Sequence, residues 1–473
     1  MSSSYKLGFW VLTALVVGNM VGSGIFMLPS SLSEAASPAG VLFAWLFTGF
    51  GVLMTALVFG NLAVRKPSLT GGPQIYAKEL FPANSKASIL SGFMSTWGYW
   101  IGSVAGNVAT ITTFASYLST FFPILTSEAE WFSVGGFTLK VGNGLTFLVC
   151  SVLLWGVHFI IVRGMEEAGK LNVAVTAAKV AGFVLFIVIG LFAFDKSNIL
   201  PMTAPRFDEA GQSIGLMSQL KNAAVITLWA FIGVESAMVF ASRARKQTDV
   251  KKATILGLFI ALSIYIGISV LVMGILDQKT LIHSEKPLID AIETVIGPVG
   301  GQILAVLGLI SLFGSTIGWI MLSAEVPYQA TKQGLFLPVF QKENKKGMPI
   351  FSLNISNGLA QVLIFSTVSN SISDAFDFVI IIATLAYLVP YLISSVYQLK
   401  LVLTGETYKD LSSRISDGII GLLATIYSIW VIVAGTADIK TFSYGMILLA
   451  SGIIFIKPLL KKKSSVTKGQ KAA

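Results

Sequence analysis

The sequence contains little charge and few residues that bind metals. Only 12% of its 473 residues are charged, whereas soluble globular domains carry about 25%. An ordinary soluble fold is therefore excluded. The single cysteine, Cys150, excludes an intramolecular disulfide framework, and the two histidines, His158 and His283, are too far apart in sequence to suggest a metal centre. We expect neither a metal nor any other cofactor.

The chain also lacks the motifs of common enzymes. It contains no G-x-x-x-x-G-K-[ST] phosphate-binding loop and no H-E-x-x-H zinc motif. The longest stretches outside the apolar runs, 123–142, 195–221 and 330–349, are too short for a soluble catalytic domain. This argues against a membrane-embedded sensor or enzyme. No selectivity-filter repeat is visible, which favours a carrier over a channel.

Apolar residues, by contrast, are abundant. They make up 54% of the chain and form runs of about 20 residues, each able to cross ~30 Å of hydrocarbon. These runs predict an all-α integral membrane protein with twelve transmembrane helices in the lipid bilayer. The predicted spans are 7–30, 40–63, 89–122, 143–162, 171–194, 222–241, 253–276, 295–329, 350–368, 376–399, 417–437 and 441–460.

The basic residues indicate how the chain is oriented. Most Lys and Arg residues fall in the connections on the same side as the N-terminus. The positive-inside rule then places both termini in the cytoplasm of a multi-pass protein of the cell membrane. The net charge of +10 is thus a topology signal and does not indicate a nucleic-acid partner.

The first predicted span is interrupted by the segment Gly18–Phe26, which reads GNMVGSGIF. Glycines and small polar residues at this depth predict a break in the helix, because freed amides are costly in hydrocarbon unless something binds them. The N–H groups of Gly22, Ser23 and Gly24 would then lie at the positive end of a half-helix and could receive a carboxylate. The alternative is a seam of small residues between packed helices.

The sixth predicted span has a similar interruption. The segment Thr227–Ala237 contains Trp229, Gly233 and the mid-membrane carboxylate of Glu235. A buried carboxylate must face a cavity, pair with another group or keep its proton. Two breaks that lie five helices apart, in helices of opposite direction, predict an inverted repeat of five plus five helices with a binding site where the breaks meet.

The third predicted span carries a polar stripe. Tyr99, Ser103, Asn107 and Thr110 recur at the spacing of one helical face. Polar groups in a membrane helix face the bundle interior or a wet cavity. The stripe therefore indicates either cavity lining or hydrogen bonds between helices.

Two further residues are unusual for their depth in the membrane. Lys179 lies too deep in the fifth span to reach the interface easily, so it has either a functional role or a structural pairing with backbone carbonyls. Trp319 stands beside glycines within the eighth span and provides either core packing or an aromatic face for a cation.

Three segments carry a family resemblance: Gly18–Phe26, Leu228–Ala237 and Gly318–Leu322. They resemble the amino acid–polyamine–organocation (APC) superfamily, and within it the basic amino acid/polyamine antiporters. The segment Glu325–Tyr328 looks more like the arginine/ornithine or lysine type than the arginine/agmatine type. The resemblance implies a twelve-helix fold with discontinuous helices one and six, often a homodimer, that exchanges small basic amino acids.

The resemblance also implies a division of the chain. Residues 1–200 would form the first five-helix repeat and residues 201–400 the second, inverted one. Residues 401–460 would hold helices eleven and twelve as scaffold or dimer contact, and residues 461–473 a basic cytoplasmic tail.

By resemblance, the substrate-binding residues would be Asn19, Met20, Gly22, Ser23, Gly24, Tyr99, Ser103, Asn107, Trp229, Ile232 and Trp319. Ser23 and the amides around Gly24 would bind the substrate carboxylate. Carbonyls near Met20, Trp229 and Ile232 would bind its α-amino group.

The distal cation would stack on Trp319, with Asn107 and Ser103 as polar contacts. Glu235 would serve as a protonation or gating carboxylate. Lys179 resembles a lysine of related members that stands in for a bound sodium ion, so we expect its ammonium to lie near the broken first helix and the eighth span. The alternative function is proton-coupled uptake of lysine or another amino acid, with Glu235 or Lys179 as the coupling group.

Overall fold

The computed structural model describes residues 6–83, 85–135, 137–207, 211–284, 286–368 and 372–435, together with residues 443, 446–447 and 450–456. The α-helices of these residues are α1 Phe9–Met20, α2 Ser23–Ala35, α3 Pro38–Arg65, α4 Lys86–Leu118, α5 Val141–Val162, α6 Met165–Phe192, α7 Leu216–Phe231, α8 Ser236–Val239, α9 Gln247–Ile275, α10 Gln278–Ile282, α11 Pro287–Ile296, α12 Pro298–Lys332, α13 Ile350–Ile364, α14 Ile372–Thr404 and α15 Leu411–Gly435. Short 3-10 helices are η1 Pro73–Leu80, η2 Pro123–Thr126, η3 Ala241–Arg243, η4 Pro338–Gln341 and η5 Phe365–Val368.

Within the described residues, nine helical segments are long and apolar enough to cross a membrane. They match nine of the predicted spans and support a multi-pass helical membrane protein. Helix α4 has 33 residues but is not among the nine, because its polar stripe lowers its mean hydropathy. Helix α7 ends after 16 residues at a break. The last predicted span, 441–460, lies largely outside the described residues, so the count of twelve remains a prediction.

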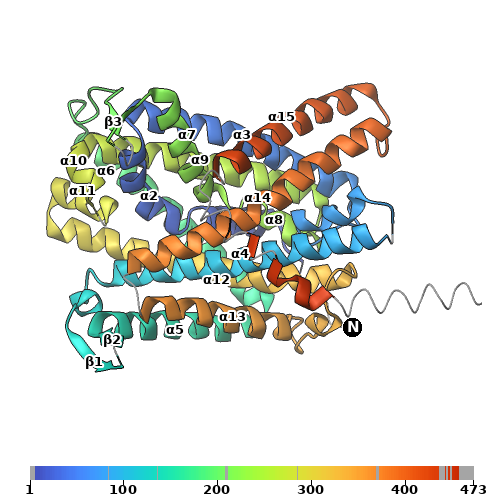
Figure 1. The fold of residues 1–473 in the computed structure, drawn as a ribbon, viewed down its shortest axis with the longest axis horizontal. Helices are drawn as coiled ribbons and strands as arrows, with labels where there is room; N and C mark the ends of the chain where they lie inside the picture. The colour runs from blue at the N-terminus through green and yellow to red at the C-terminus, as the bar shows by residue number, and fades with distance from the viewer. Residues whose placement is uncertain are drawn as a thin grey trace, which may run out of the picture.

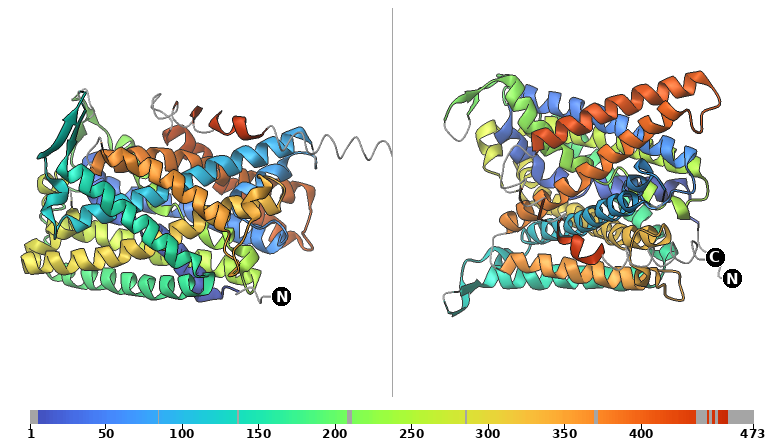
Figure 2. Two further views of the ribbon diagram at one scale, coloured as in Figure 1. Left: turned by 90° about the horizontal axis from the view of Figure 1, so that it is seen from below. Right: turned by 45° about the vertical axis from the view of Figure 1, so that its right-hand side comes forward.

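The helices run side by side as one bundle (Figures 1 and 2). Helix α4 packs against both α12 and α14, α3 packs against α7 and α9, and α6 packs against α1 and α12. The two halves of the broken helices, α1–α2 and α7–α8, therefore lie among long helices on several sides. This arrangement surrounds both breaks with protein.

The chain is not wholly α-helical. Strands β1 Glu130–Val134 and β2 Phe137–Lys140 form an antiparallel hairpin that pairs Val134 with Phe137 and has an irregularity after Glu130. This hairpin lies at the end of the bundle opposite the end marked N (Figure 2). A second small pair joins β3 Arg206–Phe207 to β4 Ser213–Ile214. Both pairs lie in connections between predicted spans, so they change the all-α expectation only there.

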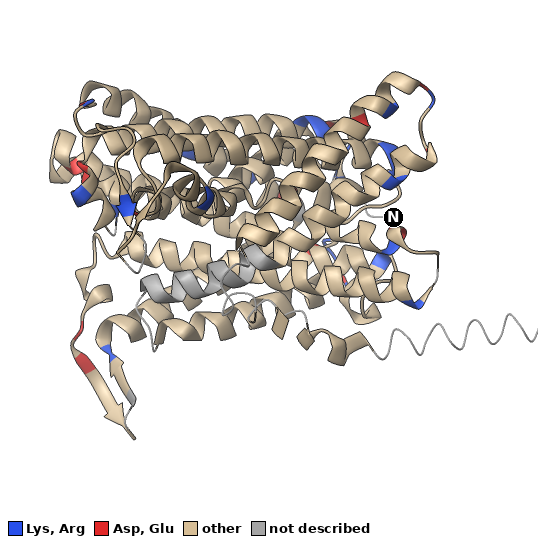
Figure 3. Ribbon diagram, turned by 45° about the horizontal axis from the view of Figure 1, so that its top comes forward, with Lys and Arg blue, Asp and Glu red and all other residues tan. Residues whose placement is uncertain are grey.

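Charged residues lie mostly at the two ends of the bundle, and the middle is almost free of them (Figure 3). The segment just before α1 is held at one of these ends. The amide of Leu7 donates to the carbonyl of Arg243 at 2.7 Å, and the amide of Arg245 donates back to Leu7 at 2.9 Å. The segment before α1 is thus joined to the segment after α8, at the end predicted to face the cytoplasm.

Candidate functional site

The predicted break in the first span is confirmed. Helix α1 ends at Met20, helix α2 begins at Ser23, and Val21 and Gly22 lie between them. The amide of Gly22 donates to the carbonyl of Met20 at 2.7 Å, which closes a tight turn. The first amides of any helix have no acceptor within it. The amides of Ser23 and Gly24 are therefore available at the positive end of α2.

The predicted break in the sixth span is also confirmed, and the two breaks touch. Helix α7 ends at Phe231 and α8 begins at Ser236. Gly233 has φ +107°, a conformation that side chains rarely adopt, and a methyl group added there would lie 2.9 Å from Asn19 Cβ. Asn19 Nδ2 donates to Ser236 Oγ at 2.8 Å. The end of α1 is thus held against the second break.

Lys179 lies where the sequence predicted, at the broken first helix and the eighth span. Its Nζ donates to the carbonyls of Gly18 at 3.0 Å and Val21 at 2.6 Å, and to Ser315 Oγ of α12 at 2.6 Å. Ser315 Oγ also donates to Gly18 O at 2.7 Å. The ammonium therefore holds the carbonyls that the end of α1 leaves free, as a bound cation would.

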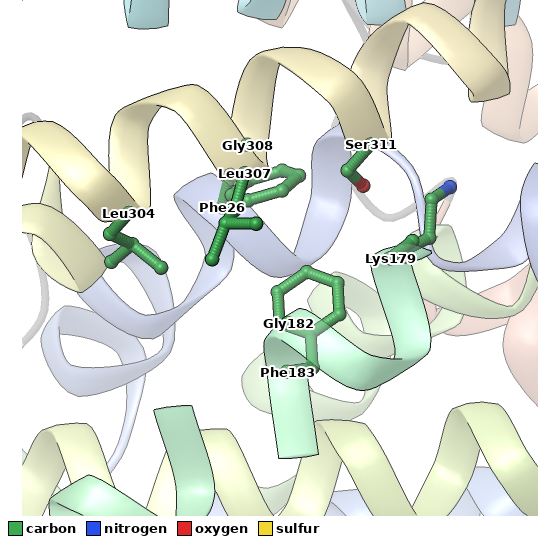
Figure 4. Close-up of a pocket in the computed structure, with 8 residues that line it drawn as sticks. All are labelled: Phe26, Lys179, Gly182, Phe183, Leu304, Leu307, Gly308 and Ser311. Atoms are coloured by element: carbon green, nitrogen blue, oxygen red, sulfur yellow. The ribbon is translucent and has the colours of Figure 1, made fainter. Parts of the chain in front are cut away.

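A small pocket borders the stem of Lys179 (Figure 4). It is lined by Phe26, Lys179, Gly182, Phe183, Leu304, Leu307, Gly308 and Ser311. The Ser311 hydroxyl is buried and has no hydrogen-bond partner among the described residues. The ammonium of Lys179 points away from the other lining residues, and its three bonds join it to the break. This pocket is distinct from the place where the predicted substrate residues gather.

Glu235 is fully buried and held by neutral donors. Tyr99 Oη donates to Glu235 Oε1 at 2.8 Å, Tyr391 Oη donates to Oε2, and the Gly233 amide donates to Oε2 at 3.2 Å. Tyr99 thus contacts the predicted gating carboxylate directly. Tyr391 was missed by the sequence analysis, although it directly follows Pro390 in the tenth predicted span.

The residues predicted to bind the main chain of a substrate lie close together. A methyl group added at Gly24 would lie 3.3 Å from Trp229 Cδ1, so the start of α2 faces the end of α7. The carbonyl of Met20 accepts from Gly22, and that of Trp229 accepts from the Ile232 amide at 3.2 Å. A carbonyl oxygen has two lone pairs and can accept a second bond. The structure therefore brings the predicted carboxylate and amino receptors together.

The residues predicted to bind a distal cation, Ser103, Asn107 and Trp319, form a second group, which we call the distal group. A methyl group added at Gly106 would lie 2.8 Å from the Trp319 ring, so α4 and α12 are closely packed there. Asn107 follows Gly106 and is fully buried, and neither its Oδ1 nor its Nδ2 has a hydrogen-bond partner among the described residues. Ser103 Oγ donates to Tyr99 O at 2.8 Å. A buried amide without partners is costly, and a polar ligand or water would relieve that cost.

One side chain links the two groups. A methyl group added at Gly318 would lie 2.0 Å from Asn19 Oδ1, so α12 approaches the end of α1 next to Trp319. The Oδ1 atom of Asn19 is buried without a partner among the described residues. The predicted site residues of α1, α2, α4, α7 and α12 therefore converge on one region of the bundle.

The comparison with known protein families identifies the family of this chain. The sequence profile of the amino acid permeases matches residues 7–456. The chain belongs to the amino acid permease family. The match covers both breaks, Lys179 and the distal group, and it confirms the resemblance to the APC superfamily inferred from the sequence segments.

Individual relatives of this permease cover nearly its whole length. A putative arginine/ornithine antiporter of Bacillus subtilis is 53% identical over 464 residues, 98% of each chain. An arginine/ornithine antiporter of Pseudomonas aeruginosa is 37% identical, covering 96% of this chain and 91% of its own. An arginine/agmatine antiporter of Chlamydia pneumoniae is 32% identical, with 98% and 92% covered.

Proposed function

We propose that this permease exchanges basic amino acids, in the manner of an arginine/ornithine antiporter, by alternating access across the cell membrane. The observation that carries this proposal is the contact between two half-helix ends of opposite polarity. The N-terminus of α2, with Ser23 and Gly24, faces the C-terminus of α7 at Trp229. The first end favours a carboxylate and the second an ammonium, which are the two charges of every amino acid.

The distal group provides the preference for a basic side chain. Trp319 offers an aromatic face to a cation, and Asn107 and Ser103 offer polar contacts beside it. Trp229 and Ile232 would contact the aliphatic stem between these ends. Two relatives that are named arginine/ornithine antiporters support the same substrate class.

The same proposal includes the finer architecture. Twelve transmembrane helices would comprise two inverted repeats, residues 1–200 and 201–400, with α1–α2 and α7–α8 as the matching broken helices. Residues 401–460 would be scaffold or dimer contact, and residues 461–473 a basic tail. Both termini would lie in the cytoplasm. Alternating access would then rock one group of helices about the site at mid-membrane.

Exchange of arginine for ornithine moves no net charge, so it requires no ion gradient. Lys179 fits this mode, since its ammonium already occupies the carbonyls of α1 that a coupling cation would otherwise hold. We therefore propose that Lys179 holds the break and that Glu235, with Tyr99 and Tyr391, forms a gate next to the substrate. The protein acts as a carrier and not as an enzyme.

The test is transport into proteoliposomes. Labelled arginine should enter vesicles loaded with ornithine at least about tenfold faster than empty vesicles, and an imposed pH gradient should drive no accumulation. Trp319→Leu should raise the KM for arginine, because the face for the cation is lost. The matched variant Trp10→Leu, at a residue 68% exposed in α1, should behave like the wild type. Equal uptake into empty and loaded vesicles would remove the exchange proposal.

A further inference from the structure

Tyr387 lies at the junction between the distal group and the Glu235 gate. This residue of α14 is only 1% exposed. Its ring makes edge contacts with Tyr99 at 4.8 Å, Trp319 at 6.2 Å and Tyr391 at 6.2 Å between ring centroids. It thus contacts the proposed cation-stacking tryptophan and both tyrosines that hold Glu235.

The hydrogen bonds around Ser103 determine which way the Tyr387 hydroxyl points. Ser103 Oγ donates its single proton to Tyr99 O at 2.8 Å. The 2.9 Å contact between Ser103 Oγ and Tyr387 Oη must then use the proton of Tyr387. Tyr387 is therefore the donor in this pair. Its phenolic oxygen keeps an acceptor lone pair that no hydrogen bond given for the described residues uses.

Asn107 places a second unused acceptor in the same region. It lies one helical turn beyond Ser103 on α4, so both residues belong to the same helical face. Both atoms of its amide are without partners among the described residues, and Trp319 packs against the preceding Gly106. The Asn107 amide can present either its oxygen or its NH₂ group to a ligand. The Tyr387 hydroxyl already donates its hydrogen bond to Ser103, so toward a ligand its oxygen can only accept.

We infer that Tyr387 is a specificity-determining residue whose oxygen accepts a hydrogen bond from the distal cation of the substrate and disfavours neutral analogues. This inference rests on the proposed exchange of basic amino acids. An ammonium or guanidinium group presents only donors. Citrulline has the shape of arginine but carries a carbonyl oxygen in place of one NH₂ group. With that oxygen opposite the Tyr387 lone pair, two acceptors are in contact and repel each other, and in the other orientation citrulline offers only an N–H that carries no charge.

The test compares arginine with citrulline. Tyr387→Phe keeps the ring contacts and removes the oxygen. A hydrogen bond to a charged group is worth about tenfold or more in affinity. We therefore expect the KM for arginine to rise about tenfold, and the preference for arginine over citrulline to fall by a similar factor, in counterflow into loaded proteoliposomes. A role in packing alone would leave this preference unchanged.

Two further variants make the test specific. Tyr117→Phe is the matched control, because Tyr117 is also a buried tyrosine with ring contacts but its hydroxyl has no partner among the described residues, ten residues beyond Asn107 on α4. It should show the wild-type preference. Ser103→Ala removes the acceptor of the Tyr387 hydroxyl. That hydroxyl can then donate a hydrogen bond to citrulline, so the KM for citrulline should fall. This second variant decides the question if Tyr387→Phe does not fold.

The outcomes separate this inference from the proposed function. If Tyr387→Phe and Ser103→Ala both keep the wild-type preference for arginine over citrulline while Trp319→Leu weakens arginine binding, the role of Tyr387 is wrong and the exchange proposal stands. If the wild type shows no counterflow with arginine or ornithine, both are overturned.

Discussion

The ion pair between Arg243 and Glu325 should keep one end of the bundle closed. Arg243 Nε lies 2.8 Å from Glu325 Oε1, and Nη2 lies 3.0 Å from Oε2, so the pair is bidentate. The Arg243 side chain is 14% exposed and that of Glu325 only 1%. Gln329 Nε2 donates to the same carboxylate at 2.5 Å. The pair joins the segment after α8 to α12, at the end predicted to face the cytoplasm.

The contribution of this ion pair to stability follows from its geometry. Two unit charges ~3 Å apart attract by roughly 5 kcal/mol at an effective dielectric constant of about 20, before the cost of desolvation. Removing one partner of a buried pair costs about 3–5 kcal/mol, whereas replacing both by apolar residues is nearly neutral. Because Arg243 is partly exposed, we expect about 3 kcal/mol for Arg243→Met or Glu325→Met alone. The double variant should regain most of that stability, so that it loses less than about 1 kcal/mol and not the roughly 6 kcal/mol that two additive losses would give.

Two measurements check this prediction. Thermal unfolding in detergent should show a lower midpoint for each single variant and a near wild-type midpoint for the double variant. Cysteine labelling should show that the double variant is nevertheless more open. Cys150 is fully buried, so an added Met238→Cys on α8 would report access to the break. If the free energy of opening falls by about 1.4 kcal/mol, the open population rises tenfold and labelling becomes tenfold faster.

The control is an exposed ion pair in α6. Lys170 and Glu166 lie 2.7 Å apart but their side chains are 69% and 52% exposed. Replacing both Lys170 and Glu166 should change the free energy of unfolding by less than about 0.5 kcal/mol and leave the labelling rate of the added cysteine unchanged. If instead the losses for Arg243 and Glu325 simply add, and the double variant is labelled at the wild-type rate, the pair does not close this end and the reasoning fails.

Three other predictions test the site and its scaffold. Lys179→Met should weaken substrate binding at least about tenfold, because two carbonyls of the break lose a charged donor. The control Lys170→Met in the same helix should leave binding unchanged. An unchanged KM of Lys179→Met in counterflow would contradict this prediction. Gly233→Ala should abolish exchange, because φ is +107° and the new methyl group meets Asn19, whereas Gly215→Ala points into open space and should be silent in the same assay. Asp417→Asn should lower the unfolding midpoint without changing the KM, because Asp417 holds Arg65 at 2.6 Å and lies outside the proposed site.

The local features of the site could be predicted from sequence because each one violates a rule of membrane helices. Glycines and polar residues in mid-span predicted the breaks that the structure has after Met20 and Phe231. A lysine too deep to reach the interface must find acceptors nearby, and the nearest free carbonyls are those of a broken helix. The depth of Lys179 therefore indicated a functional role or a pairing with carbonyls, and the family resemblance added that it lies at the broken first helix.

Contacts between distant segments could not be predicted in this way. Arg243 stands among other basic residues of a connection, and nothing in its neighbourhood in the sequence indicates that it pairs with a glutamate 82 residues away. Tyr391 looks like an ordinary aromatic residue of an apolar span until α14 is packed against α4. The small strands β1 to β4 were also missed, because short pairings in connections have no periodic pattern long enough to recognise.

The four half-helix ends at the two breaks bear on the proposed binding of an amino acid between them. Lys179 holds the negative end of α1, and Glu235 accepts from the amide of Gly233 at the second break. The protein thus supplies its own cation, Lys179, to one side of the first break and its own carboxylate, Glu235, to one side of the second. At the other two ends, the bonds given for the described residues come from neutral groups, such as Tyr265 Oη to Ala230 O at 2.6 Å on α7. The ends of α2 and α7 therefore still lack charged partners, and a carboxylate and an α-ammonium on one carbon match them. Because Lys179 and Glu235 belong to the chain, every substrate of the proposed exchange would meet the same ends of α2 and α7, and selection among amino acids would fall to Trp319, Asn107 and Tyr387.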